Sequence, residues 1–319
     1  MALAAVAALA ATAGCSGSGG KESEDGDGEG VKTPRITVAM VSHSGEGDTF
    51  WDIVQSGAKD AARKDNVRFD YSNNKDGGQQ AQLVQAAIDK KVDGLIVTLA
   101  KPDALRAVVK KAVRAGIPVV TINSGAEYSA RFGALTHIGQ DERVAGEAVG
   151  RELTARGKKK ALCVIHEQGN VSLEERCAGA KKTFRGSLTT LNVDGTDMPG
   201  VQSSLEAKLQ ADKGLDAVLT LGAPFTAAAG KAKERAGSPA EVDTFDLNAQ
   251  VVKDMKAKRI GFAVDQQPYL QGYEAVDELW LHAYNANVLG GGKPVLTGPQ
   301  ILTRDDVPRL EKYTERGTR

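Results

Sequence analysis

Apolar runs alternate with amphipathic segments from residue 35 onward, and this pattern predicts alternating strands and helices. The first run, RITVAMV at 35–41, precedes a segment whose apolar residues recur at helical spacing from about residue 50. Further strands are expected at 67–72, 94–100, 115–123, 160–166, 216–222, 241–246 and 260–265, each followed by a helix. Strands that are apolar along their whole length, with helices between them, indicate parallel sheets covered on both faces.

Two stretches of the chain resemble each other. VDGLIVTLAKP begins at Val92, and LDAVLTLGAP begins at Leu215. Each places an apolar strand after an Asp and a proline-led helix after a turn, which favours two similar α/β lobes. Chance similarity between strands of parallel sheets is the alternative. The length of 319 residues also favours two lobes, because single cores rarely grow beyond roughly 250–300 residues.

The first 14 residues, MALAAVAALAATAG, are small and apolar and stop at Cys15. A helix of this length would span about 21 Å, which is short of the roughly 30 Å core of a bilayer. Residues 1–15 are therefore expected to be a secretory signal segment. TAGC resembles a bacterial lipoprotein processing site, which implies a lipid on Cys15; a plain secretion signal is the alternative. Residues 16–33 consist mainly of Gly, Ser and charged residues, which predicts a flexible linker.

The two remaining cysteines fall in one strand–helix unit: Cys163 ends an expected strand, and Cys177 opens the helix that follows. In a secreted chain such a pair is expected to form a disulfide, with two buried thiols as the alternative. A bridge here would stabilise the fold by about 3 kcal/mol on the loop-entropy model.

The charge balance gives no reason to expect a nucleic acid partner, since 41 Lys and Arg match 41 Asp and Glu. The four histidines lack metal-ligand spacing. Neither G-x-S-x-G nor a phosphate-binding loop motif occurs in the sequence. We therefore expect no enzyme, no cofactor and no metal site. Asp48 with Asp246, as a carboxylate pair for glycoside cleavage, is the enzymatic alternative.

Polar and aromatic residues gather where the expected strands end, which is where open parallel sheets bind ligands. These residues are His43, Asp48, Phe50, Trp51, Thr98, Asn123, Ser124, Asn170, Arg176, Asp246, Asn248 and Gln266. Amides, hydroxyls, carboxylates and a guanidinium suit an uncharged ligand with many hydroxyls, whose C–H face packs on an aromatic ring. Phe50 and Trp51 are thus expected to form an apolar wall of the site. The alternative is that one of the two rings packs within its own lobe, and Trp51 is the stronger candidate for this.

From about residue 35 to residue 298, the chain resembles the ribose-type, type I periplasmic binding proteins of sugar ABC transporters. The segments that carry the resemblance are DTFWDIVQSGAKDAA, KVDGLIVTLAKPDAL, AGIPVVTINSG, GALTHIGQDERVAG, EERCAGAKKTF and AVDQQPYLQGY. The resemblance implies two doubly wound parallel-sheet lobes, joined by a three-strand hinge, that close on one sugar. It implies ligand-binding roles for Asp48, Phe50, Trp51, Thr98, Asn123, Ser124, Arg176, Asp246 and Gln266.

Three positions depart from the ribose binders. Asn123 and Ser124 stand where those proteins place an Asp and an Arg, and Gly222 stands where they place an Asn. These changes favour a ligand other than ribose, such as an acyclic polyol. The SGEG insertion and the NVSLEE segment suggest Glu46 and Asn170 as additional contacts.

The resemblance also implies lobe boundaries. The N-terminal lobe is expected to comprise 34–139, part of 248–265, and 268–294. The C-terminal lobe is expected to comprise 140–247 and 295–310. Hinge crossings are expected near 138–141, 246–249 and 266–268.

These features predict an extracytoplasmic substrate-binding lipoprotein that captures a monosaccharide or sugar alcohol by hinge closure. It would deliver this ligand to the permease subunits of an ABC importer, without a cofactor. We expect a monomer that binds no nucleic acid. It would be attached to the outer face of the cell membrane through its lipid anchor only, or lie in the periplasm. A solute receptor feeding a sensor kinase and an extracytoplasmic carbohydrate-active enzyme are the two alternatives.

Overall fold

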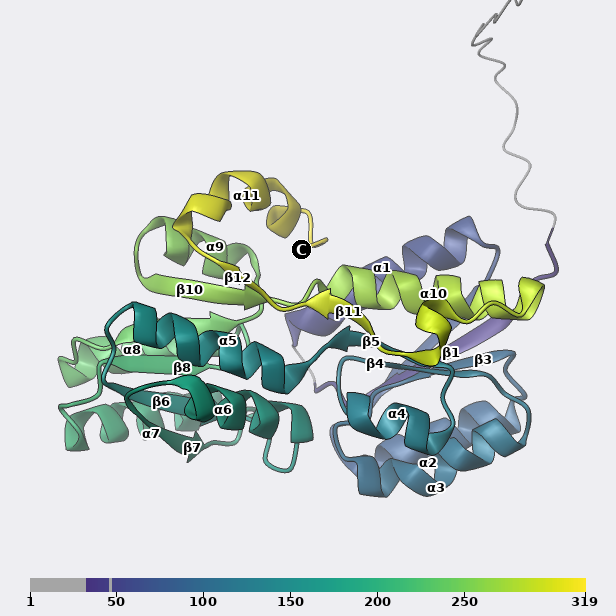
Figure 1. Ribbon diagram of the computed structural model, residues 1–319, viewed down its shortest axis with the longest axis horizontal. Coiled ribbons are helices and arrows are strands. Elements are labelled where there is room, and N and C mark those ends of the chain that lie inside the picture. Colours follow the sequence, from purple (N-terminus) through teal and green to yellow (C-terminus); the bar gives the residue numbers. More distant parts are fainter. Residues whose placement is uncertain (1–32, 46–47) are drawn as a thin grey trace, which may run out of the picture.

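Two six-stranded sheets form two lobes, each with helices on both faces of its sheet (Figure 1). The structure is a computed structural model that describes residues 33–45 and 48–319. The lipidation site expected at Cys15, residues 16–32 of the expected linker and the contact expected from Glu46 lie outside the described residues.

The first sheet has the strand order β11-β5-β4-β3-β1-β2, and all of its strand pairs are parallel. Its strands are β1 (Thr37–Ser42), β2 (Arg68–Asn73), β3 (Gly94–Val97), β4 (Val119–Ile122), β5 (Thr136–Gln140) and β11 (Val295–Gly298). Its helices are α1 (Thr49–Lys64), α2 (Gly77–Asp89), α3 (Pro102–Arg114), α4 (Ala126–Phe132) and α10 (Pro268–Asn285), with a short 3-10 helix at Leu289–Gly292.

The second sheet has the order β12-β10-β9-β8-β6-β7, in which β12 runs antiparallel to β10 and the other pairs are parallel. Its strands are β6 (Lys160–Ile165), β7 (Ser187–Asn192), β8 (Ala217–Thr220), β9 (Glu241–Phe245), β10 (Ile260–Asp265) and β12 (Gln300–Leu302). Its helices are α5 (Glu142–Ala155), α6 (Val171–Thr183), α7 (Met198–Ala211), α8 (Phe225–Ala236), α9 (Ala249–Lys256) and α11 (Val307–Glu315), with a 3-10 turn at Arg304–Asp306.

The two sheets repeat one topology. Strands β2-β1-β3-β4-β5 of the first sheet and β7-β6-β8-β9-β10 of the second follow the same order, offset by five strands. The similar sequences that begin at Val92 and Leu215 form β3 and β8, which hold equivalent places in the two sheets. The predicted fold of two doubly wound parallel-sheet lobes is therefore confirmed.

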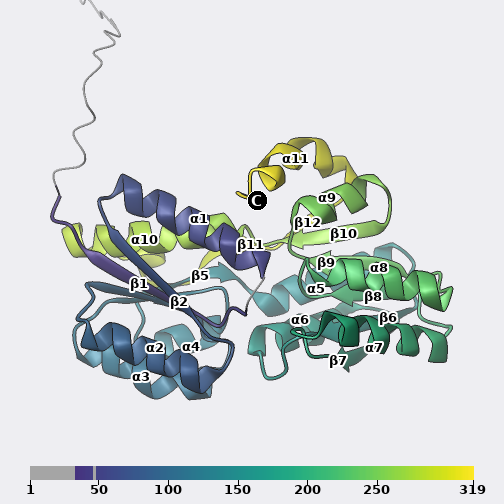
Figure 2. The ribbon, with the colours of Figure 1, turned by 180° about the vertical axis from the view of Figure 1, so that it is seen from behind.

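Successive side chains of each buried strand enter different cores, which explains the continuous apolar runs. In β1, Val38 and Met40 pack in the core under α1 and α10, whereas Ala39 and Val41 pack in the core under α2 and α3. Figure 2 shows the two helix layers on opposite sides of this sheet.

Helices α5 and α6 of the second lobe are held unusually close together. A Cβ atom at Gly146 would lie 2.2 Å from the carbonyl oxygen of Arg176, so only glycine permits this approach. A disulfide between Cys163 and Cys177 joins α6 to β6 inside the same core. The middle of α6 is thereby fixed both to its sheet and to α5.

The chain passes between the two sheets at 140–142, 265–268 and 298–300. The first two passages lie in segments where we expected hinge crossings. At 246–249 the chain instead stays in the second lobe, because β9 and β10 are neighbours in one sheet. Residues 249–265 accordingly belong to the second lobe, and β11, expected in the C-terminal lobe, lies in the first sheet. An apolar run predicts a strand but not its sheet, and the short, half-buried β11 and β12 lack such a run.

Candidate functional site

A cleft of about 1370 Å³ lies between the lobes, at the carboxyl ends of the strands. Each lobe contributes residues that the sequence singled out. The predicted residues that line the cleft are His43, Asp48, Phe50, Trp51, Asn123, Ser124, Asn170, Arg176, Asp246 and Gln266. Residues far apart in the sequence are therefore brought together by the order of the strands.

The aromatic pair at the start of α1 belongs both to the cleft and to the lobe core. Phe50 and Trp51 are 8% and 3% exposed, and both pack in the core under α1 and α10. Their rings meet edge to face at 5.2 Å, and Trp51 meets the His43 ring in the same way at 5.1 Å. Both rings also line the cleft. The two interpretations of these rings, ligand wall and lobe packing, are thus compatible.

Helix α1 begins where it does because Asp48 caps it. The Asp48 Oδ1 atom accepts a hydrogen bond from the Phe50 N–H at 3.1 Å. Burial raises the pKa of this carboxyl to about 6, against the opposing effect of that hydrogen bond. The cap places the Asp48 carboxylate beside the aromatic rings, where it could accept a hydrogen bond from an OH group of a ligand.

A chain of hydrogen bonds joins the polar residues of the cleft across the passage from β10 to α10. The Ser124 hydroxyl donates to Asn123 Oδ1 at 2.7 Å, and Asn123 Nδ2 donates to Gln266 Oε1 at 3.1 Å. Gln266 Nε2 in turn donates to Asp246 Oδ1 at 2.6 Å. Asn123 and Asp246 have φ angles of 61° and 69°, a left-handed conformation that costs energy in residues other than glycine. Such strain is concentrated at binding sites.

Burial also governs the charge of Asp246. Desolvation raises the pKa of Asp246 to about 7, although the Arg176 guanidinium and the bond from Gln266 both lower it. Repulsion by Asp48 and Glu142 raises the pKa of Asp246 further, and repulsion by other acidic neighbours does the same for Asp48. An uncharged ligand with OH donors would supply the hydrogen bonds that such carboxylates lose on burial.

The Arg176 side chain is fixed in place by other residues of the second lobe. Its Nε and Nη2 atoms donate to the two Glu142 oxygens at 2.6 and 2.9 Å, and Nη1 donates to the Leu221 carbonyl at 3.1 Å. Its guanidinium lies 4.5 Å from the Phe245 ring centre, and the residue is 3% exposed. A guanidinium has five N–H donors, so two remain for a ligand. Glu142 reaches Arg176 because α5 approaches α6 so closely.

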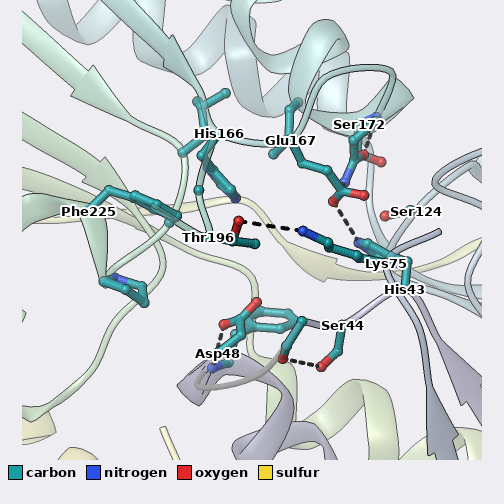
Figure 3. A pocket seen from close by; sticks show the side chains of 18 of the residues that line it. His43, Ser44, Asp48, Lys75, Ser124, His166, Glu167, Ser172, Thr196 and Phe225 are labelled. Atoms are coloured by element: carbon teal, nitrogen blue, oxygen red, sulfur yellow. Dashed lines mark hydrogen bonds and ion pairs between the residues drawn. The ribbon is translucent and has the colours of Figure 1, made fainter. Parts of the chain in front are cut away.

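Several second-lobe residues of the cleft were not predicted from the sequence, among them an aromatic pair and a carboxylate. His166 and Phe225 stack with ring centres 4.0 Å apart, and Glu167 lies next to them (Figure 3). Burial lowers the pKa of His166 to about 3, so this ring is neutral. Its Nδ1 atom is buried without a hydrogen-bond partner among the described residues. His166 directly follows β6, so the rule that ligands bind after strand ends could have found it. Phe225 begins α8 after β8, as Phe50 lies at the start of α1 after β1, so the same rule could have found it too.

The lobes contact each other directly across the cleft. Lys101 Nζ of the first lobe lies 3.0 Å from Glu167 Oε1 of the second, and the Val171 N–H donates to the Ala100 carbonyl at 3.1 Å. Lys75 Nζ points toward Thr196 Oγ1 at 3.5 Å (Figure 3). Glu167 Oε2 accepts from Asn170 Nδ2 at 2.9 Å and lies 3.9 Å from His43 Nε2. The structure is thus a form in which the lobes are close together.

Two other predicted residues lie away from the cleft lining in the described part of the chain. Thr98 is fully buried, and its hydroxyl contacts the His43 backbone N–H at 3.0 Å and the His43 ring at 2.8 Å. It therefore positions His43. Asn248 caps α9 by accepting from the Val251 N–H at 2.8 Å. Across residues 33–45 and 48–319, no group of three His, Cys, Asp or Glu side chains is arranged to hold a metal ion.

Comparison with known proteins agrees with this architecture. The sequence profile described as the periplasmic binding protein domain matches residues 38–286. The xylose/arabinose-binding protein of Sulfolobus acidocaldarius is 23% identical over 300 residues, covering 88% of this chain and 74% of that protein. The D-ribose/D-allose-binding protein of Pseudomonas aeruginosa is 27% identical over 253 residues, covering 75% of this chain and 78% of that protein.

Solved structures show the same arrangement. A carbohydrate transporter protein from Acidothermus cellulolyticus, in complex with myo-inositol, is 48% identical with a TM-score of 0.89. That match covers 90% of this chain and all of the other. An ABC transporter solute-binding protein from Burkholderia graminis, in complex with D-arabinose, is 26% identical with a TM-score of 0.75, covering 85% of this chain and 96% of the other.

Proposed function

Because the chain belongs to the periplasmic binding protein family, we propose that it captures a monosaccharide or sugar alcohol between its lobes and delivers it to an ABC importer. The observation that carries this proposal is the cleft itself, where two aromatic rings of one lobe and a rigid arginine of the other line one space. Aromatic faces, amides, carboxylates and a guanidinium together suit a neutral ligand with many hydroxyls.

Among such ligands we propose a polyol of the inositol class as the first to test. The protein that is 48% identical was solved with myo-inositol. In this chain Asn123 and Ser124 stand where a ribose binder places an Asp and an Arg, which removes one charged pair from the first lobe. A cyclic polyol has hydroxyls around its whole rim, so donors and acceptors from both lobes can engage it at once.

Capture would work by closure of the lobes. The three passages at 140–142, 265–268 and 298–300 are the covalent connections about which the lobes could turn. A ligand that bonds to Asp48 in one lobe and Arg176 in the other gains both sets of contacts only when the lobes are close. Its differential affinity for the closed form would shift the population toward that form.

The proposed location is the outer face of the cell membrane, with a lipid on Cys15 and residues 16–33 as the tether. Stable attachment requires more than one acyl chain, as bacterial-type lipidation would supply. Within the part of the chain that the structure describes, no helix has the length and apolar character needed to cross a membrane.

A thermal-shift panel of inositols, pentitols, pentoses and hexoses tests the binding role, followed by calorimetry on any hit. A ligand at 100 times its Kd stabilises the folded state by about 2.7 kcal/mol, which corresponds to a rise in Tm of roughly 4–5 °C for a chain of this size. If no carbohydrate or polyol shifts the Tm, the proposal fails. Analysis of the same incubations by NMR would reveal product if the protein were instead a carbohydrate-active enzyme.

A further inference from the structure

A second groove, of about 1100 Å³, is lined by residues of α11 in the second lobe and of α1 and α10 in the first. Its lining is strongly basic, with six cationic side chains and a single carboxylate, that of Asp60. The cationic residues are Lys59, Arg63, Arg309, Lys312, Arg316 and Arg319. In a chain with 41 basic and 41 acidic residues, this concentration of one charge is a local feature that needs an explanation.

Only part of this positive charge is neutralised within the described residues. Asp60 accepts from the Tyr269 hydroxyl at 2.6 Å and pairs with Arg63. Arg309 pairs with Asp306 at 2.8 Å, and Arg319 pairs with the buried Asp265. These contacts pair three of the six cations with carboxylates.

The other three cations contact neutral groups. Lys312 and Arg316 lie over the Tyr313 ring, 4.8 and 5.2 Å from its centre, and Arg316 Nε donates to Thr318 Oγ1 at 3.2 Å. Lys59 Nζ contacts only the Gln55 amide, at 3.5 Å, among its described neighbours. Lys59 belongs to the first lobe and the other two to the second, so positive charges of both lobes face one groove.

We propose that this groove binds a phosphate-type polyanion that links α1 of the first lobe to α11 of the second. Four of its six cations are arginines, whose planar guanidinium groups match the oxygens of phosphate through paired hydrogen bonds. A polyanion also relieves the mutual repulsion of cations held on both sides of the groove. The same chemistry is offered by a soluble polyphosphate and by the head group of an anionic lipid.

Binding here is coupled to the cleft between the lobes. The groove takes cations from both lobes, so its width depends on how the lobes are oriented, as does the width of the cleft. A ligand at either site that prefers one orientation changes the affinity of the other site by the same factor. The anion site itself does not depend on the identity of any cleft ligand.

Calorimetry with pyrophosphate at low ionic strength, on the full chain without cleft ligand, tests the site. The variant Lys312→Glu with Arg316→Glu reverses two exposed charges four residues apart, one on α11 and one at its C-cap. Lys110→Glu with Arg114→Glu is the matched control, with the same spacing and charge change on α3. We expect the α11 variant to weaken pyrophosphate binding at least tenfold, and the control to change it less than twofold.

Equal weakening by the two variants would show non-specific attraction to net charge and would overturn the proposal, as would the absence of binding to the unmodified protein. Circular dichroism confirms that both variants are folded. Flotation with phosphatidylcholine vesicles, with and without 30% phosphatidylglycerol, separates the two sources of phosphate. Retention on anionic vesicles that requires Lys312 and Arg316 supports a lipid head group, whereas pyrophosphate binding without retention supports a soluble anion.

Discussion

The ion pair between Lys101 and Glu167 is expected to stabilise the closed form and hence ligand binding. The pair joins the lobes at 3.0 Å, and its side chains are 28% and 20% exposed. When the lobes separate, both groups return to water. Breaking the pair should therefore act on the Kd for the cleft ligand more than on the free energy of unfolding of either lobe.

The size of the effect follows from the partial burial of this pair. Fully exposed pairs contribute about 0–1 kcal/mol, whereas removing one partner of a buried pair costs about 3–5 kcal/mol. At roughly a quarter exposure, and with Asn170 still bonded to Glu167, we expect a coupling of about 1 kcal/mol, which is a factor of roughly 5 in Kd.

A double-mutant cycle isolates this coupling from direct contacts of Glu167 with a ligand. The variants are Lys101→Met, Glu167→Gln and their combination, and the assay is the Kd of the best ligand from the panel by calorimetry. We expect the two single losses to exceed, when added, the loss in the double variant by about 1 kcal/mol. Strict additivity, with a coupling below about 0.3 kcal/mol, would refute the reasoning.

Three further predictions concern the cleft. Arg176→Met combined with Glu142→Gln removes both partners of the buried pair, so the fold should persist. The Kd for the cleft ligand should rise more than about tenfold, because hydrogen bonds to a charged group contribute about 1.5–3 kcal/mol. An unchanged Kd in calorimetry would show that Arg176 has a purely structural role. Trp51→Ala should lower the free energy of unfolding by about 3–5 kcal/mol through lost core packing, and it should also abolish most of the ligand-induced rise in Tm. If the variant kept the full ligand-induced rise in Tm, the Trp51 ring would serve core packing only. Asp246→Asn tests the raised carboxyl pKa of about 7. The stability that protonation of Asp246 gives is complete below about pH 4 and is lost as the pH rises through 7. The unfolding free energy of the variant relative to the unmodified protein, measured in urea, should therefore increase from pH 5 to pH 8, and a decrease would contradict this pKa.

The elements of the lobes could be predicted because their signals are local. The strand of residues 37–42 is buried on both faces, so every position along it is apolar or small. The pairing of Cys163 with Cys177 followed from one strand and its helix. The assignment of strands to lobes could not be predicted at the third passage, since the edge strands at 295–298 and 300–302 bury few side chains.

Cleft residues were easiest to predict where a side chain directly follows a strand. Asn123, Asp246 and Gln266 directly follow β4, β9 and β10. Glu142, which fixes Arg176, lies 34 residues away on another helix, and its role depends on the close approach of α5 and α6 at Gly146. No local pattern specifies such a contact. The stacking of Phe225 on His166 is likewise a contact between segments far apart in the sequence.

The most direct test of the proposed function is a crystal structure of the protein grown with the ligand selected by the panel, with myo-inositol as the first choice. The account predicts one ligand molecule between the lobes, with its C–H face against Phe50 or Trp51 and its hydroxyls bonded to Asp48 and Arg176. A cleft without ligand at saturating concentration, or a ligand bound elsewhere on the protein, would contradict it.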